Sequence, residues 1–393
     1  SMESTDASHD HLADALQNHP VFASAMCNDD FRELFVEDIR LLGEEILSGD
    51  RMQAEIEEAA GIWQPYMEDQ YLRFGDTSQY WNHELERITD FYESRFGCKV
   101  YKIALDAGCT CPNRDGTKGV GGCIFCSEQG SGDFVPGREK PIEVQVSEAK
   151  ARIESKLRGR SGGRRGKYIA YFQNFSSTYG DEDALIKKYD AALFQSDVVG
   201  IAIATRPDCI GEKIFSWISE KSRETFVQIE LGLQSSKEET GRLINRCSTN
   251  GDYESAVSRL MEIAPDAHIV THLIFGLPGE SERDMMESVR FVRMENMRGQ
   301  RESRTFGLKI TVLYVVSRTV LCAMYERGEY ECLSKESYFS LVKKALSLLG
   351  GNCIIHRLTG DPPKRVLVAP AWTADKKRVM NELKSFLAGD SVV

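Results

Sequence analysis

Long hydrophobic runs are missing from this chain. Among its 393 residues, no apolar stretch approaches the roughly 18 residues that a transmembrane helix needs. The first residues also lack the charged start and apolar core of a secretory signal. The eleven cysteines are an odd number without a regular framework, which is atypical of disulfide-stabilised proteins from oxidising compartments. We therefore expect a globular, cytoplasmic protein with no membrane association.

A dinucleotide-binding turn is missing as well. Residues 100–105 (VYKIAL) form a short apolar run typical of a β-strand. The Gly-x-Gly-x-x-Gly turn of a Rossmann fold does not follow this run. Its place is taken by a loop, residues 105–127, that carries four cysteines and several glycines. We call this segment the cysteine loop, and its presence disfavours a Rossmann fold.

Thiolates at the spacing of this loop fit two kinds of metal site. Cys123 and Cys126 form a Cys-x-x-Cys pair whose sulfurs can reach one metal centre, and eleven residues separate Cys111 from Cys123. Zinc prefers four thiolates in a closed tetrahedral site, with Cys109 as the fourth. An iron–sulfur cluster takes one thiolate per iron, so three cysteines leave one iron open to a non-protein ligand. The loop alone fits both alternatives.

Strands and helices alternate along most of the chain. The sequence predicts strands at residues 100–105, 168–173, 198–204, 226–232, 269–275 and 307–315, with helices between them and a last helix at 335–349. Short apolar runs of this kind are typical of parallel strands buried on both faces. Six β/α units in succession indicate a partial barrel or a doubly wound sheet. Polar residues at the strand ends, such as Gln173 and Gln234, mark the expected active-site face.

Residues 1–76 differ from the rest of the chain in charge. They hold 18 acidic and 4 basic residues, a net charge of −14, so the remaining residues carry +3. The amphipathic pattern of residues 31–47 predicts a helix. We expect a helical extension packed on the main body, with docking of a partner protein as the alternative. We divide the chain into this extension, a barrel core (77–320) and a C-terminal α/β segment (321–393) that closes the barrel.

A series of motifs in order resembles the radical S-adenosylmethionine (SAM) superfamily. The motifs are CPNRDGTKGVGGCIFC (111–126), YFQNFSSTY (171–179), ATRPDC (204–209), ELGLQS (230–235), LINR (243–246), THLIFGLPGE (271–280), YERGEY (325–330) and HRLTGDPPKRVLVAPAW (356–372). Within that superfamily the chain resembles the YhcC-like family, which is related to the radical SAM domain of the Elongator catalytic subunit. The resemblance begins near residue 78 and implies an α/β fold, a partial (β/α)6 barrel.

The resemblance also implies cofactors and site residues. It implies a 4Fe–4S cluster held by Cys111, Cys123 and Cys126, with SAM on the fourth iron and a flavodoxin- or ferredoxin-type reductant. Cys109 departs from the aromatic residue usual in relatives, and we expect a buried spectator. The implied SAM contacts are Phe125, Gln173, Glu230, Gln234 and Arg246. The candidates for catalysis are His272, His356 and Tyr314.

These assignments have plainer alternatives. Arg246 matches an arginine that holds the SAM carboxylate, which suits a guanidinium fork, but a solvent-facing charge is the alternative. Glu230 has a structural ion pair as its alternative, and His272 an ordinary structural hydrogen bond. We expect the polar tail at residues 356–365 to close the open side of the barrel and contact substrate.

A basic loop lies between the first barrel helix and the second strand. Its cations suit a phosphate backbone: Lys156, Arg158, Arg160, Arg164, Arg165 and Lys167. The loop precedes a strand, so we expect it at the amino-terminal face, where a solvated loop is the alternative. Together with the resemblance to the Elongator subunit, it predicts a tRNA substrate modified at the wobble uridine side chain. The competing hypotheses are a small metabolite or peptide substrate, and a non-catalytic iron–sulfur or zinc protein.

Overall fold

A computed structural model describes residues 88–127, 130, 139–157, 166–298 and 304–388. The predicted extension at 1–76 lies outside the described residues, as do Arg158, Arg160, Arg164 and Arg165 of the basic loop. None of the helices in the described part of the chain is long and apolar enough to cross a membrane.

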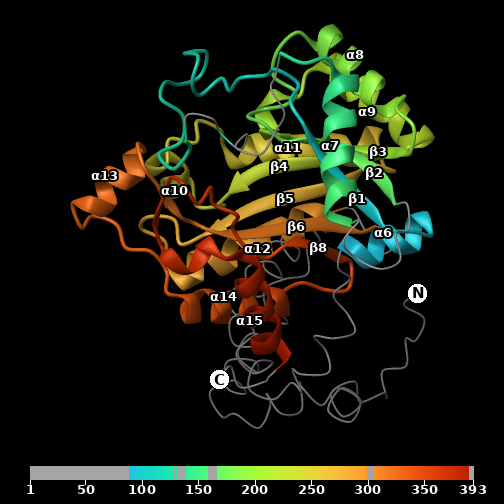
Figure 1. Cartoon of the computed structure of the whole chain (residues 1–393). Coiled ribbons are helices and arrows are strands. Elements are labelled where there is room, and N and C mark those ends of the chain that lie inside the picture. The colour runs from blue at the N-terminus through green and yellow to red at the C-terminus, as the bar shows by residue number, and fades with distance from the viewer. Residues whose placement is uncertain (1–87, 128–129, 131–138, 158–165, 299–303, 389–393) are drawn as a thin grey trace, which may run out of the picture. The chain divides into compact units, whose positions relative to one another are not determined.

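The core of the fold is one parallel sheet that curls into a partial barrel (Figure 1). Its strand order is β1-β2-β3-β4-β5-β6-β8, and every neighbouring pair is parallel. The strands are β1 (Val100–Leu105), β2 (Lys167–Phe172), β3 (Val198–Thr205), β4 (Phe226–Gln234), β5 (His268–Phe275), β6 (Phe306–Val312) and β8 (Cys353–Arg357). The predicted strands are confirmed to within three residues at each end, because their apolar runs are buried in the sheet.

Helices follow the strands in the alternating order that the sequence predicted. They are α7 (Ile142–Leu157), α8 (Glu182–Leu193), α9 (Glu212–Glu224), α10 (Glu238–Leu243), α11 (Asn250–Ile263), α12 (Glu282–Met297), α13 (Val320–Glu326), α14 (Lys335–Ser347) and α15 (Lys376–Ala388). A capping box in which Thr249 and Asp252 bond each other's backbone N–H begins α11. This cap fixes the start of the helix at Asn250.

The strand β8 was not predicted. We expected six strands and a closing C-terminal segment, but the chain returns through α14 and adds Cys353–Arg357 to the sheet beside β6. The segment CIIHR has only three apolar residues before two polar ones, too short a run to signal a strand. Further on, the short strands β7 (Val315–Val316) and β9 (Leu367–Ala369) pair antiparallel, so the C-terminal segment is joined to the barrel at two places.

An aromatic helix, α6 (Ile88–Phe96), lies at the amino-terminal end of the strands, at the opposite end of the sheet from α10 and α13 (Figure 1). The rings of Phe91, Tyr92 and Phe96 pack within about 6 Å of the Phe226 ring. The Tyr92 hydroxyl donates to Gln228 Oε1 inside the barrel at 3.0 Å. This helix therefore closes the end of the barrel that faces away from the cysteine loop.

Candidate active site

The cysteine loop follows β1 and lies at the carboxyl ends of the strands. Its turns need glycine: Gly122 has a φ of +77°, and a Cβ there would lie 2.9 Å from Arg114 Nε. The amide of Asn245, beyond β4, donates to the carbonyls of Val120 and Gly122 at 3.2 and 2.9 Å. Ile124 N–H donates to the Ile244 carbonyl at 3.1 Å. The loop is thus held in place by the segment after α10.

A second anchor holds the loop through Arg206. Its guanidinium binds Asp208 with two hydrogen bonds of 2.9 Å and also donates to the carbonyls of Arg246 and Cys247. Asp208 in turn accepts from Lys118 of the cysteine loop. Arg206 therefore connects the loops after β3 and β4, and Asp208 connects them to the cysteine loop.

Each of the three predicted ligand cysteines has a hydrogen-bond donor at its sulfur. Ser176 Oγ lies 4.0 Å from Cys111 Sγ, and Asn113 Nδ2 lies 3.7 Å from Cys123 Sγ. A hydrogen bond with Cys123, aided by the nearby Arg114 guanidinium, lowers the pKa of Cys126 to about 7. The same hydrogen bond, together with burial, raises the pKa of Cys123 well above its usual value. The two thiols therefore share one proton, which a bound metal would displace. The serine, asparagine and arginine donors suit the thiolates that hold a cluster.

The zinc alternative would need Cys109 as a fourth thiolate ligand. Among the residues that the structure describes, no three cysteine, histidine or carboxylate side chains converge on one point. Cys109 is buried and lies near Tyr189 of α8. This location agrees with the expected spectator role.

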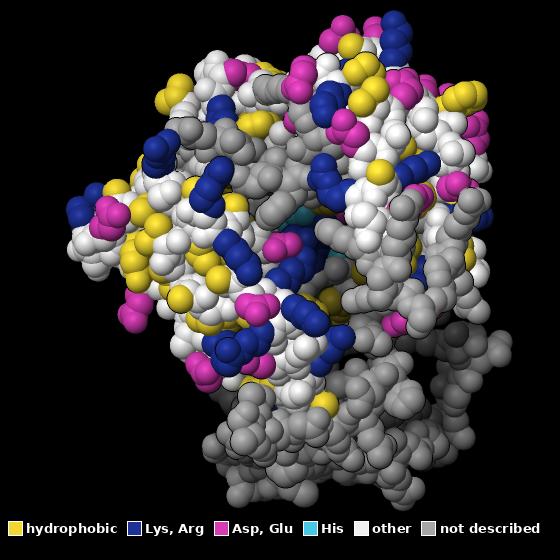
Figure 2. Space-filling model, in the orientation of Figure 1, with side chains coloured by type: hydrophobic (Ala, Val, Ile, Leu, Met, Phe, Trp, Pro, Cys, Tyr) yellow, Lys and Arg dark blue, Asp and Glu magenta, His cyan; other side chains and the backbone are white. Residues whose placement is uncertain are grey.

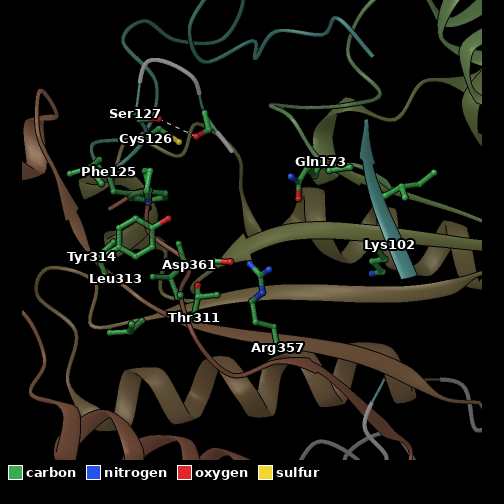
Figure 3. A pocket seen from close by; sticks show the side chains of 18 of the residues that line it. Lys102, Phe125, Cys126, Ser127, Gln173, Thr311, Leu313, Tyr314, Arg357 and Asp361 are labelled. Atoms are coloured by element: carbon green, nitrogen blue, oxygen red, sulfur yellow. Dashed lines mark hydrogen bonds between the residues drawn. The ribbon is translucent and has the colours of Figure 1, made fainter. Parts of the chain in front are cut away.

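A cavity of about 620 Å³ opens inside the barrel next to the cysteine loop. Cys126 and Phe125 line one end of it, and Lys102 and Arg357 line another part, as Figure 3 shows. Its volume is in the range of small-ligand sites. Of the other residues predicted from the sequence, Gln173 and Tyr314 also line this cavity. Their predicted contacts with SAM or substrate stay predictions.

The polar tail also reaches the cavity, as expected. Arg357, Gly360, Asp361 and Pro363 line it. Gly360 lies against the Tyr314 ring, where a Cβ would be only 3.1 Å from Cδ1. A side chain at this position would press on the ring, so the glycine lets the tail pass this close to the residues that follow β6.

A layer of six polar side chains crosses the barrel interior. We call it the polar layer, and each strand of the seven-stranded sheet except β3 contributes one member: Lys102, Tyr171, Glu230, His272, Lys309 and Arg357. Only Glu230 and His272 were candidates from the sequence. A lysine inside an apolar strand, as in VYKIAL and GLKITV, was the signal that would have indicated Lys102 and Lys309.

Glu230 is the centre of this layer. Its Oε1 accepts from Lys102 Nζ at 2.9 Å and from Gln228 at 2.5 Å, and its Oε2 accepts from Tyr171 at 2.6 Å and from Lys309. Oε2 also lies 2.9 Å from His272 Nε2. Burial alone would raise the pKa of Glu230, but the two lysines hold it well below its usual value. The structure therefore favours the structural ion pair over a SAM contact.

Arg246 differs from the expectation that it binds the SAM carboxylate. Its guanidinium is buried and donates to the carbonyls of Ser248, Leu233 and Ser235 at 2.7–2.8 Å. Its remaining nitrogen bonds Glu238 and Asn250, both at 3.4 Å. An arginine has five N–H donors, and all five are used here. Arg246 thus ties the end of β4 to the start of α11 and has no donor left for SAM.

The other two candidates lie apart from the cavity lining. His356 Nε2 lies 2.8 Å from His268 Nε2, and the two rings stack beside Phe91 of α6. Burial lowers the pKa of His356 and that of His268, the latter to about 3. This neutral pair belongs to the closed end of the barrel, which does not support a catalytic role for His356. Gln234 ends β4 with a φ of 64°, a strained conformation often found at functional sites.

His272 is expected to weaken the fold in mild acid. Burial lowers its pKa to about 4, against about 6.5 in an unfolded chain. The unfolded chain therefore takes up the proton first, so stability present above pH 6.5 is lost as the pH falls toward 4. Allowing for the partial exposure of the ring, we expect a loss of about 2 kcal/mol. Urea titrations between pH 7 and 4 measure the free energy of unfolding. If it falls as steeply with decreasing pH in His272→Gln as in the wild type, the prediction is wrong.

The comparisons with known proteins agree with this geometry. Residues 111–292 match the Radical SAM superfamily and residues 306–388 match the Radical_SAM C-terminal domain. The chain is 38% identical over 292 residues to YtqA of Bacillus subtilis, which covers 74% of this chain and 86% of YtqA. It is 29% identical over 221 residues to Elongator complex protein 3 of Schizosaccharomyces pombe, covering 55% of this chain and 38% of that protein.

A solved structure shares the fold. The archaeal Elp3 of Methanocaldococcus infernus, with its N-terminus deleted, superposes with a TM-score of 0.52 at 18% identity, covering 73% of this chain and 63% of that one. Members of the matched family use a 4Fe–4S cluster and SAM, and they need a reductant. The chain is therefore a radical SAM enzyme, a member of the YhcC-like family that is related to Elongator.

Proposed function

We propose that this enzyme holds its cluster on Cys111, Cys123 and Cys126 and modifies the side chain of a tRNA wobble uridine. When bound, the cluster supplies the electron that cleaves SAM to methionine and a 5′-deoxyadenosyl radical. The main support for this site is the cavity, because Cys126 and Phe125 of the cysteine loop line it. A substrate in this cavity would lie beside the cluster and be screened from bulk water by the barrel wall.

The RNA substrate is supported by the similarity to Elongator complex protein 3 and by the basic loop. Lys156 stands near the end of α7 and Lys167 begins β2, so both flanks of the loop lie at the amino-terminal face, where a bound tRNA would reach around the barrel. We further propose a flavodoxin- or ferredoxin-type reductant, and a protein partner for the acidic residues 1–76.

We expect tRNA to stimulate SAM cleavage by the reduced, cluster-loaded protein. Total tRNA is added to the anaerobic enzyme with dithionite, and 5′-deoxyadenosine is measured over time. Replacing Arg164 and Arg165 by glutamine should weaken tRNA binding. It should also make binding less dependent on salt, by about 0.7–0.9 in log–log slope for each phosphate that the variant no longer neutralises.

The matched control carries Arg223→Gln and Arg283→Gln, which remove two exposed cations from the outer helices α9 and α12. This control should bind tRNA as the wild type does. SAM cleavage that is indifferent to tRNA, together with no saturable tRNA binding, would reject the RNA substrate and favour a small metabolite or peptide.

A further inference from the structure

The polar layer holds more positive than negative charge. Its cations are Lys102, Lys309 and Arg357, which we call the barrel floor, and its carboxylate is Glu230. Both lysines also lie about 5 Å from the centre of the Tyr171 ring. One carboxylate therefore faces three basic side chains, and burial lowers the pKa of one of them, Lys309, to about 7. Figure 2 shows Lys and Arg side chains gathered around and within a central hollow on this side of the molecule.

Glu230 has no capacity left for the third cation. Its two oxygens already accept from Lys102, Lys309, Tyr171 and Gln228, and His272 lies against it as well. A carboxylate offers about four lone-pair positions, and these contacts use all of them. The lysines are thus paired with Glu230, and Arg357 is left out of the ion pair.

Arg357 has no hydrogen bond or ion pair with any residue that the structure describes. It lines the cavity and its guanidinium points into it (Figure 3). Asp361 lines the same cavity, but its carboxylate binds Lys376 at 2.8 Å. Arg357 lies near two lysines and forms no ion pair with Asp361 or any other described carboxylate. Such a placement is unfavourable, which indicates that an anion from outside the chain complements it.

We infer that the barrel floor binds a carboxylate or phosphate group of a small organic substrate through Arg357 and Lys102. The planar guanidinium matches two oxygens of such a group, and Lys102 adds a second cation on the facing strand β1. The backbone of an RNA is excluded from this position, because the floor lies at mid-strand depth and α6 closes the barrel beneath it.

The position of the floor gives the anion an anchoring role. In Figure 3 Cys126 and Phe125 lie across the cavity from Lys102 and Arg357, with Gln173 and Thr311 between them. A molecule held by its anionic group at the floor would extend toward the cluster end, where a hydrogen atom is to be removed. This inference rests on the proposed radical SAM site. It identifies a small organic anion as a substrate or co-substrate that enters the barrel, whether or not RNA is also bound.

The experiment measures anion binding without any turnover. Malonate and inorganic phosphate are titrated into the full-length, cluster-loaded, unreduced protein at constant ionic strength, and melting temperature and binding heat are recorded. We expect saturable binding of at least one probe, weakened at least about tenfold in Arg357→Met. The control Arg223→Met removes an exposed arginine from α9 and should bind as the wild type does.

The variant is expected to fold, because Arg357 bonds none of the described residues, and removing it should raise the melting temperature of the anion-free protein. Lys102→Gln provides a second test, with weakened binding expected. Malonate binding alone indicates a carboxylate, and phosphate binding alone indicates a phosphate. No saturable binding, or equal binding by Arg357→Met, would overturn the inference. If the protein cleaves SAM but binds no anion, the proposed anion site is wrong and the proposed reaction stands. If it binds an anion but does not cleave SAM, the proposed reaction is wrong and the anion site stands.

Discussion

Replacing Cys126 by alanine is expected to reduce SAM cleavage by at least about 100-fold. Of the three predicted ligands, Cys126 lines the cavity, so its sulfur is placed to bind iron at the cavity wall. Without it, two cysteines of the predicted set remain, and a four-iron cluster needs one protein ligand for each of three irons. Production of 5′-deoxyadenosine and the iron and sulfide content of the reconstituted protein measure the effect.

Two other cysteines serve as controls for this result. Cys98 precedes β1 outside the cysteine loop, and Cys98→Ala should keep both iron and activity. Cys109→Ala should also keep them, because Cys109 is packed beside Tyr189 rather than held at the cavity. Loss of iron in Cys109→Ala, with no SAM cleavage by the loaded wild type, would instead indicate a closed site with four thiolates and no open iron.

Replacing Glu230 by alanine is expected to destabilise the fold by about 3–5 kcal/mol. The carboxylate is fully buried and neutralises Lys102 and Lys309, both of which are held inside the barrel. Its removal leaves these cations, together with Arg357, without an internal anion. Chemical denaturation monitored by circular dichroism gives the free energy of unfolding.

A control and a double variant make this prediction specific. Glu220→Ala removes an exposed carboxylate on α9 and should change stability by less than about 0.5 kcal/mol. Adding Lys309→Met to Glu230→Ala should restore part of the stability, because it removes one of the unpaired charges. If Glu230→Ala costs no more than Glu220→Ala, the polar layer does not support the barrel as we describe.

The strands and the cysteine loop could be predicted from the sequence because their signals are local. A buried parallel strand is a short apolar run, and β1 was predicted at the residues the structure gives it, Val100–Leu105. Ligand cysteines for one cluster lie close together in the chain, so their spacing is visible without a fold. The motif order from residue 111 onward identified the family for the same reason.

Side-chain roles that depend on distant partners were harder to predict. Arg246 has the position of a SAM-binding arginine in its motif, yet its five donors go to protein acceptors that include carbonyls at the end of β4. His356 stands in a polar motif, but it is paired with His268, 88 residues away. A motif gives the residue type at a position, and the fold decides which atoms its donors meet.

The sequence by itself determined the alternating β/α order, the cysteine loop and the family, because apolar period and cysteine spacing are properties of neighbouring residues. Only the tertiary structure decided the polar layer. Lys102 and Arg357 are 255 positions apart in the chain, and they reach the same cavity because β1 and β8 form the two edges of one curled sheet. Which charges pair depends on contacts between residues that are distant in the chain. The unpaired charge of the barrel floor therefore could not be predicted from the order of residues.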